Sequence, residues 1–481
     1  MNPFLRTHAF SGGEWIGAAS GATFPVTNPA TGEILAQVPD LGVIETEAAI
    51  TQAAAAQTLW AARPAKERGA ILKRWADLMM AHQAALAELL TLEQGKPLAE
   101  AKGEVAYAAS FLEWFGEEAR RASGEVIPSP RSDSRILVIK QPVGVVATVT
   151  PWNFPYAMLT RKVGPALAAG CTVIAKPAED TPLCALALAD LGVQAGVPAG
   201  VFNVLTGDAA TIVGALMRSE TVRKISFTGS TEVGKLLLRQ AADTVKRVSL
   251  ELGGNAPFIV FDDADVDAAV TGAMASKFRN SGQTCVCANR FYVQDGVYDA
   301  FTEKFTAAIE ALKVAPGLEA GATQGPLISQ AAVEKVEDHI ADALAKGAVL
   351  KTGGSRHALG GTFFQPTLLT ETPASAKLAH EETFGPVAAL FRFKTEDEAI
   401  ARANASESGL AAYVYTRDLG RAFRVGEALQ VGMVGLNEGI ISTAEAPFGG
   451  VKQSGLGREG ARVGLDEYLE IKYMLVGGLG R

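Results

Sequence analysis

Residues 143–179 read VGVVATVTPWNFPYAMLTRKVGPALAAGCTVIAKPAE, and this stretch sets the pattern of the fold. Two short apolar runs, each ended by Gly, Pro or Asn, flank a stretch that is typical of a helix. The same alternation continues through GVFNVLTG (200–207), KISFTGS (224–230) and VSLELGGN (248–255). Strands that alternate with helices in this way predict a parallel sheet of the doubly wound, Rossmann type in an α/β protein.

The regions on either side extend this α/β pattern. Residues 45–120 are rich in Ala, Leu and Glu with apolar residues every three or four positions, which predicts helices. Residues 256–440 again mix strand-like runs (PFIVF, RFYV, AALFRF, AAYVYT) with amphipathic helices. A chain of 481 residues exceeds what one core usually holds, so we expect two or three domains, the second also α/β.

Two segments have no obvious sheet partner. Residues 125–140, EVIPSPRSDSRILVIK, resemble two strands joined by a polar turn, and the tail YLEIKYMLV (468–476) resembles a lone strand. Exposed strand edges usually pair with another subunit, which predicts a homodimer or homotetramer. The alternative is a local hairpin packed on its own domain.

Composition narrows the class of partner. The 44 Lys and Arg against 52 Asp and Glu give a net charge of −8, which argues against nucleic acid or an anionic membrane as the main partner and favours a small molecule. No apolar run reaches the roughly 18 to 20 residues of a membrane span, and the N-terminus lacks a secretion-signal pattern. Four cysteines are too few for a disulfide scaffold, so we expect a soluble cytoplasmic protein in which Cys171 and Cys184 are buried packing residues. No metal site is predicted.

Chemically informative residues follow the predicted strands, where ligands collect in doubly wound sheets. Asn153, held between prolines and aromatics in TPWNFP, is either a fixed amide donor for an oxyanion or a buried residue that satisfies its loop. Lys176 and Glu179 in KPAED suit the ribose of a dinucleotide, and the carboxylate would favour NAD over NADP; a solvated pair at a helix start is the alternative.

The segment GSTEVGK (229–235) resembles a phosphate loop, but Leu236 stands where Ser or Thr would hold magnesium, which disfavours an ATPase. Gly229 and Ser230 still suit close approach of a pyrophosphate, with a structural turn as the alternative.

A second group surrounds Cys285 in NSGQTCVCANR, a polar, glycine-bearing setting that is unusual for a core thiol. A helix start there would supply backbone amides. Because a free thiol is mostly protonated at neutral pH, something must lower its pKa or take its proton. Glu251, at a strand end in LELGG, is the carboxylate candidate.

Seven motifs, TPWNFP, KPAED, FTGSTEVG, LELGGN, GQTCVCANR, EETFGP and PFGGVKQSGLGREG, occur in the order seen in the aldehyde dehydrogenase superfamily, which the whole chain resembles. The resemblance implies a Rossmann-type cofactor domain at residues 1–122 and 143–253 and an α/β catalytic domain at 254–453. It also implies small β oligomerisation segments at 123–142 and 454–481.

The resemblance also implies roles for individual residues. Cys285 would be the nucleophile, Asn153 and the Cys285 backbone N–H would hold the oxyanion, and Glu251 would activate water for thioester hydrolysis. Trp152 and Phe448 match residues near the substrate tunnel. The residues implied to bind NAD or NADP are Trp152, Lys176, Glu179, Gly229, Ser230, Glu382 and Phe384.

Within the superfamily the chain most resembles succinate-semialdehyde dehydrogenases, through RNSGQTCVCANR, MLTRKVGPALAAG and EGIISTAEAPFGG. Arg161, Arg279 and Ser442 match their carboxylate-binding set, although either arginine could instead serve a salt bridge. Cys287 matches a partner that forms a disulfide with the nucleophile on oxidation, or is a packing residue. Alternatives to succinate semialdehyde are glutarate semialdehyde, a neutral aldehyde, or a catalytically silent scaffold.

Overall fold

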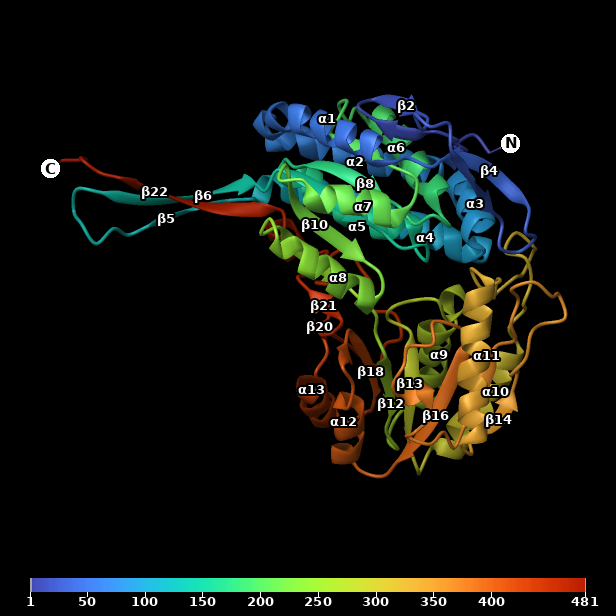
Figure 1. The fold of residues 1–481 in the computed structure, drawn as a ribbon. Helices are drawn as coiled ribbons and strands as arrows, with labels where there is room; N and C mark the ends of the chain where they lie inside the picture. Colours follow the sequence, from blue (N-terminus) through green and yellow to red (C-terminus); the bar gives the residue numbers. More distant parts are fainter. Residues whose placement is uncertain (1, 481) are drawn as a thin grey trace.

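The computed structural model describes residues 2–480 and contains two α/β bodies and a projecting β-arm (Figure 1). The first body holds an eight-stranded sheet of order β2-β1-β9-β8-β7-β10-β11-β21. Strands β9, β8, β7, β10 and β11 are all parallel, as the alternating pattern predicted. The strands of this sheet are β1 (Ala9–Ser11), β2 (Glu14–Ile16), β7 (Val145–Val149), β8 (Thr172–Lys176), β9 (Phe202–Val204), β10 (Val222–Thr228), β11 (Arg247–Glu251) and β21 (Gly455–Leu456).

Helices cover both faces of this sheet. One apolar cluster joins α2 through α6 to one face, and a second joins α1, α7 and α8 to the other. The helices are α1 (Val43–Ala62), α2 (Ala65–Ala81), α3 (Gln83–Gln94), α4 (Leu98–Glu118), α5 (Pro155–Ala169), α6 (Pro182–Ala195), α7 (Ala209–Arg218) and α8 (Thr231–Ala242). The helical region expected at 45–120 is therefore confirmed.

The second body is also a helix-covered sheet, of order β14-β15-β16-β13-β12-β18-β19. Helices α9 and α10 pack on one face and α11, α12 and α13 on the other. Its strands are β12 (Ala256–Val260), β13 (Ala288–Gln294), β14 (Val349–Thr352), β15 (Thr367–Thr370), β16 (Val387–Phe393), β18 (Ala411–Tyr415) and β19 (Met433–Leu436). Its helices are α9 (Val266–Lys277), α10 (Tyr298–Glu310), α11 (Gln330–Ala345), α12 (Glu396–Asn404) and α13 (Leu419–Ala428).

The arm is a three-stranded antiparallel sheet of β5 (Glu125–Ile127), β6 (Arg135–Pro142) and β22 (Leu469–Val476), which extends away from both bodies in Figure 1. The C-terminal strand is therefore not alone: it pairs along its full length with β6 of the same chain. Apolar side chains on this arm remain exposed, among them Val126 at 70% and Ile471 at 72%.

Short elements add three features that the sequence did not reveal. Strands β3 (Thr23–Thr27) and β4 (Ile34–Pro39) form an N-terminal hairpin, and β17 (Ser408–Gly409) pairs with β20 (Val451–Lys452). Strand β21 lies within the segment expected to bridge subunits from residue 454, yet it pairs with β11 in the first sheet. Helix α14 (Val463–Asp466) follows it. Within residues 2–480, no helix is long and apolar enough to cross a membrane.

Candidate active site

A cavity of about 420 Å³ lies at the carboxyl ends of the first sheet and is lined by both bodies. It gathers most of the residues expected to act together: Trp152, Asn153, Gly229, Ser230, Glu251, Cys285, Glu382 and Phe384. A second cavity, of about 510 Å³, lies between α7 and α8 and contains Lys176 and Glu179. The two cavities share Trp152 and Gly229, so together they have room for an elongated ligand.

Asn153 is buried in the loop between β7 and α5. Its amide Nδ2 donates to the Gln283 carbonyl at 3.0 Å, and its side-chain oxygen has no hydrogen-bond partner among the described residues. The Asn153 backbone carbonyl accepts a hydrogen bond from the buried Lys96 ammonium at 2.8 Å. The amide donor is thus fixed in place and points at the segment that carries Cys285.

The Cys285 segment is a turn that leads into β13, so the helix start expected there is absent and that expectation was wrong. Asn280 and Ser281 adopt left-handed backbone conformations (φ 51° and 56°), which are uncommon for residues with side chains and often occur at functional sites. A Cβ on Gly282 would lie 2.1 Å from the Gly385 carbonyl oxygen, so only glycine fits this tight turn.

Burial raises the pKa of the Cys285 thiol to about 12. The Arg161 guanidinium acts in the opposite direction, and Glu382 and Glu251 add to the rise. Of the two ways to activate the thiol, these surroundings favour proton removal by a base over a lowered pKa. A base must take the proton when substrate binds.

Glu251 ends β11 with its carboxyl group buried, and neither of its oxygens has a hydrogen-bond partner among residues 2–480. Burial, followed by the Glu459 carboxylate, raises the pKa of Glu251 well above its usual value, against the lowering effect of Arg161 and Lys162. A carboxyl group with a raised pKa is a stronger base once ionised. A Cβ on Gly449 would lie 2.8 Å from a Glu251 oxygen, so glycine keeps this approach open.

Glu459 and Lys162 are residues of the site that the sequence reasoning missed. Glu459 is buried and pairs with both Lys162 and Arg161, the latter two on α5. The sequence contained a sign of this buried ion pair: Arg-Lys interrupts the apolar run in MLTRKVG, and Arg-Glu occurs among the glycines of GLGREG. Long charged residues in apolar surroundings are rarely buried unless they are paired.

Arg161 and Arg279 occupy different environments. Arg161 is 1% exposed, pairs with Glu459 and stacks 4.1 Å from the Phe448 ring centroid, while its Nη1 makes no hydrogen bond within residues 2–480. Arg279 is half-buried, lies 5.3 Å from the Phe154 ring centroid and has no ion pair within the same range. The salt-bridge alternative thus holds for Arg161 and not for Arg279.

Both arginines act on the Tyr107 hydroxyl, whose pKa is raised by burial and lowered by the two cations. The Cys285 thiol acts on the same hydroxyl, so the thiol and both guanidinium groups share one neighbourhood. Ser442 is half-buried in the loop between β19 and β20 and makes no side-chain hydrogen bond to any residue from 2 to 480. The structure therefore does not join Ser442 to the two arginines.

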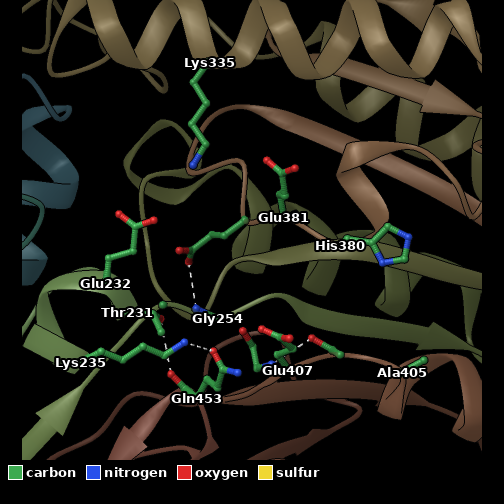
Figure 2. A pocket seen from close by; sticks show the side chains of 14 residues that line it. Thr231, Glu232, Lys235, Gly254, Lys335, His380, Glu381, Ala405, Glu407 and Gln453 are labelled. Carbon is green, nitrogen blue, oxygen red and sulfur yellow. Dashed lines mark hydrogen bonds between the residues drawn. The ribbon is translucent and has the colours of Figure 1, made fainter.

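Glu382 closes the opposite side of the cavity. Its carboxylate accepts a hydrogen bond from the Gly254 backbone at 3.2 Å, and Figure 2 shows Lys335 of α11 reaching toward the same space. Burial raises the pKa of Glu382 to about 7, and the Gly254 hydrogen bond and Lys335 oppose the rise. Beyond it lies an open cavity of about 790 Å³ that includes Lys235 and Gln453, which are hydrogen bonded at 2.7 Å. Phe384 stacks edge-on against Trp152 at 5.5 Å.

In the second cavity the Lys176 ammonium pairs with Glu179 at 2.6 Å, and Glu179 also accepts from the Ala209 backbone at 2.8 Å. Ser230 caps α8 by accepting from the Val233 backbone. A Cβ on Gly229 would lie 2.4 Å from the Phe227 ring, so glycine is required where the two cavities meet.

The remaining cysteines are free thiols. Cys171 and Cys184 are buried as expected. Cys287 is also buried; its sulfur accepts from the Thr284 hydroxyl at 2.8 Å and donates to the Lys277 carbonyl at 3.4 Å.

Comparisons with known proteins show the family of the chain. Residues 15–474 match the model of the aldehyde dehydrogenase family. The chain is 62% identical to succinate-semialdehyde dehydrogenase (NADP(+)) GabD of Escherichia coli, covering 98% of each chain. It is 60% identical to glutarate-semialdehyde dehydrogenase of Pseudomonas aeruginosa, covering 99% of this chain and 98% of the relative. The crystal structure of succinate-semialdehyde dehydrogenase from Burkholderia pseudomallei superimposes with a TM-score of 0.98 at 61% identity over 98% of each chain. The motif-based prediction is thus confirmed: the chain belongs to the aldehyde dehydrogenase family.

Proposed function

We propose that this enzyme oxidises succinate semialdehyde to succinate with a nicotinamide dinucleotide. One observation carries the proposal: the Cys285 thiol and two guanidinium groups all act on the Tyr107 hydroxyl, and one of these groups, that of Arg279, makes no ion pair within residues 2–480, although it interacts with the Glu100 carboxyl group. A fork-shaped cation fits a carboxylate, so the cavity would select an aldehyde that carries its own negative charge. Ser442 would join the two arginines in binding the substrate carboxylate only if its loop moves toward them when substrate binds.

The reaction follows from the chain's own groups. The Cys285 sulfur bonds to the aldehyde carbon as the thiol proton passes to the ionised Glu251 carboxylate, and the Asn153 amide and the Cys285 backbone N–H hold the resulting oxyanion. When bound, the nicotinamide supplies the hydride acceptor that turns the thiohemiacetal into a thioester. Glu251, after it has released the thiol proton to solvent, takes a proton from water as the water oxygen bonds to the thioester carbon. The C–S bond then breaks to release the acid, and the proton on Glu251 passes to the sulfur to restore the thiol.

The residues present fit the dinucleotide. Gly229 keeps the passage between the two cavities open, Lys176 and Glu179 would bind the adenosine ribose, and Ser230 lies at the start of α8, where a pyrophosphate is favoured. Glu382 would hold the nicotinamide ribose, with Trp152 and Phe384 as walls.

NAD is the proposed preference, although the E. coli relative is named for NADP(+). Glu179, Asp208 and Asp180 all act on Lys176, so a 2′-phosphate would meet three carboxylates and one cation. We expect Glu179→Ser to raise kcat/KM with NADP about 10-fold and to lower it with NAD. Initial rates with each cofactor test this prediction. An unchanged ratio of kcat/KM for NADP to kcat/KM for NAD would mean that Glu179 does not set the cofactor preference.

The direct test of activity is absorbance at 340 nm with succinate semialdehyde, propanal or benzaldehyde, in wild type and Cys285→Ala. We expect NADH formation by wild type to depend on the aldehyde and to vanish in the variant. A flat trace with reduced wild-type protein would favour the catalytically silent scaffold, and undiminished activity of Cys285→Ala would remove the nucleophile assignment.

Glutarate semialdehyde is the second candidate, because relatives about as similar carry that name. One methylene is worth only about 1 to 3 kcal/mol of discrimination. Comparing kcat/KM for the four- and five-carbon semialdehydes decides between them.

Assembly is proposed from the arm. Its exposed apolar residues would be covered in a homodimer or homotetramer. Within the segments 123–142 and 454–481 the strands β5, β6 and β22 of the arm would bridge subunits, while 1–122 with 143–253 and 254–453 act as cofactor and catalytic domains. Light scattering measures the assembly, and a monomer at micromolar concentration would contradict it. Four free thiols suit a reducing cytoplasm.

Reversible oxidation at Cys287 is a further proposal. The Cys287 thiol contacts Thr284 and Lys277, so a disulfide with Cys285 requires the turn 284–287 to rearrange. Peroxide should remove two hydrogens and all activity, and dithiothreitol should restore both. After peroxide and then dithiothreitol, we expect the wild type to recover its full activity and Cys287→Ser to remain inactive. Equal recovery of activity in the two proteins would contradict the switch.

A further inference from the structure

The corner between α3 and α4 reaches the oxyanion site without lining it. Lys96, fully buried, donates to Glu104 at 2.5 Å and to the Asn153 backbone carbonyl at 2.8 Å. Its ammonium also lies 3.8 Å from the Phe154 ring centroid. One cation therefore contacts two successive residues of the loop that carries the amide donor.

The partner of this cation holds the other end of the same loop. The second oxygen of Glu104 accepts from the backbone N–H groups of Tyr156 and Ala157 at 3.0 and 3.4 Å, in the first turn of α5. A single buried ion pair thus fixes residues 153–157 through both a carbonyl and two amides. The same helix α5 carries Arg161 and Lys162.

One turn earlier on α4, Glu100 reaches the nucleophile segment. Its carboxylate accepts from the Asn280 backbone N–H at 2.7 Å. The Asn280 side chain in turn donates to the Asn153 carbonyl at 3.0 Å, the same oxygen that Lys96 holds. Helix α4 therefore contacts both segments of the oxyanion site: the loop that carries Asn153 in the first body and the segment that carries Cys285 in the second.

We propose that Lys96, with Glu100 and Glu104, is a positioning group that sets the spacing between the Asn153 amide and the Cys285 backbone N–H. Two donors stabilise an oxyanion only when both lie at hydrogen-bond distance from the same point, and shifts well below 1 Å reduce the rate strongly. This inference rests on the proposed function, because it takes those two groups as the oxyanion donors.

The test is Lys96→Met, with Lys224→Met as matched control. Lys224 is also a fully buried lysine, paired with Glu467 at 3.3 Å and bonded to Ser249. We expect Lys96→Met to lower kcat about 30-fold for aldehyde oxidation and by a similar factor for cofactor-free hydrolysis of p-nitrophenyl acetate, because both need the oxyanion site. The KM for NAD and the rate of Cys285 alkylation by iodoacetamide should stay within about 2-fold of wild type, as should kcat of Lys224→Met.

A double-mutant cycle with Asn153→Ala separates positioning from general damage. If Lys96 acts through Asn153, Lys96→Met should lower kcat less than about 3-fold in the Asn153→Ala background. Full additivity, or equal loss in Lys224→Met, would overturn the inference. Should Lys96→Met fail to fold, Glu104→Gln, which retains the side-chain volume, takes its place in the same cycle.

The outcomes also distinguish the two proposals. A wild-type enzyme that reduces no NAD removes the proposed function. A wild type that is active and impaired by Asn153→Ala, but insensitive to Lys96→Met, removes only the positioning role.

Discussion

The two arginines near Tyr107 come from different bodies of the molecule and have different surroundings. Arg161 comes from α5 of the first body, is fully buried and pairs with Glu459. Arg279 comes from the loop before the nucleophile in the second body, is half-buried and stacks on Phe154 without an ion pair in the described chain.

The resemblance to succinate-semialdehyde dehydrogenases assigns both arginines to carboxylate binding, whereas their different surroundings indicate two different roles. Arg161 belongs to a buried cluster with Glu459, Lys162 and Glu251, so its charge helps to set the protonation of the reacting groups. Arg279 makes no ion pair within residues 2–480, and the Glu100 carboxyl group with which it interacts is already hydrogen bonded to the Asn280 backbone, so we expect its charge to be available to a substrate carboxylate. The comparison predicts that Arg161 serves every substrate, whereas Arg279 serves acidic ones.

The largest effect is expected from Arg161→Met. It leaves the buried Glu459 with Lys162 as its remaining partner, and should lower the free energy of unfolding by about 2 to 3 kcal/mol, somewhat less than for a buried pair broken completely. Activity should fall by roughly 1,000-fold for acidic and neutral aldehydes alike, because the change disturbs the groups that perform the chemistry. Urea unfolding and steady-state rates measure both.

Arg161→Met combined with Glu459→Gln is the control for that stability loss. Removing the second charge of the pair should recover part of the lost stability without recovering activity. If Arg161→Met oxidised neutral aldehydes at the wild-type rate, Arg161 would not serve every substrate and the comparison would be wrong.

Arg279→Met should have a smaller and selective effect. We expect kcat/KM for succinate semialdehyde to fall about 100-fold, while kcat/KM for propanal changes less than about 3-fold and stability is nearly unchanged. The ratio of the two substrates is the decisive measurement. Equal losses for both would mean that Arg279 supports the site and does not recognise the carboxylate.

The smallest effect concerns pH. Because burial raises the pKa of Cys285 to about 12 and raises that of Glu251 above its usual value, kcat/KM should increase from pH 6 to 9 as more of each group becomes ionised. Arg161 lowers the Cys285 pKa, so Arg161→Met should move the profile to higher pH by about 0.5 to 1 unit. Arg279 is not among the strongest charges on Cys285, and its removal should shift the profile by less than about 0.2 unit. Identical shifts would argue against the division of tasks.

Much of the site was predictable because the chemistry follows strand ends. Asn153, Glu251 and Cys285 each occur in a short motif beside prolines or glycines, and the parallel sheet brings the first two to one edge. The helical region, both sheets and the hairpin in the arm followed from periodicity and turn residues.

The rest depended on contacts between distant segments. Glu459 lies 297 residues from Lys162, and neither residue has a local partner that reveals a buried ion pair. The raised pKa of Cys285 likewise depends on burial in a cavity lined by both bodies, which no local motif encodes. The N-terminal strands are short and half-exposed, so their periodicity was too weak to detect.

Strand β21 has a consequence for the order of folding. It pairs with Leu250 and Glu251 although it lies more than two hundred residues later in the chain, and Glu459 lies three residues beyond its end. During synthesis the first sheet therefore emerges with the edge of β11 open and with Arg161 and Lys162 lacking their anion. Both contacts form only after residues 455–459 have been synthesised. A chain truncated before them would therefore have an unpaired strand edge and be prone to aggregation.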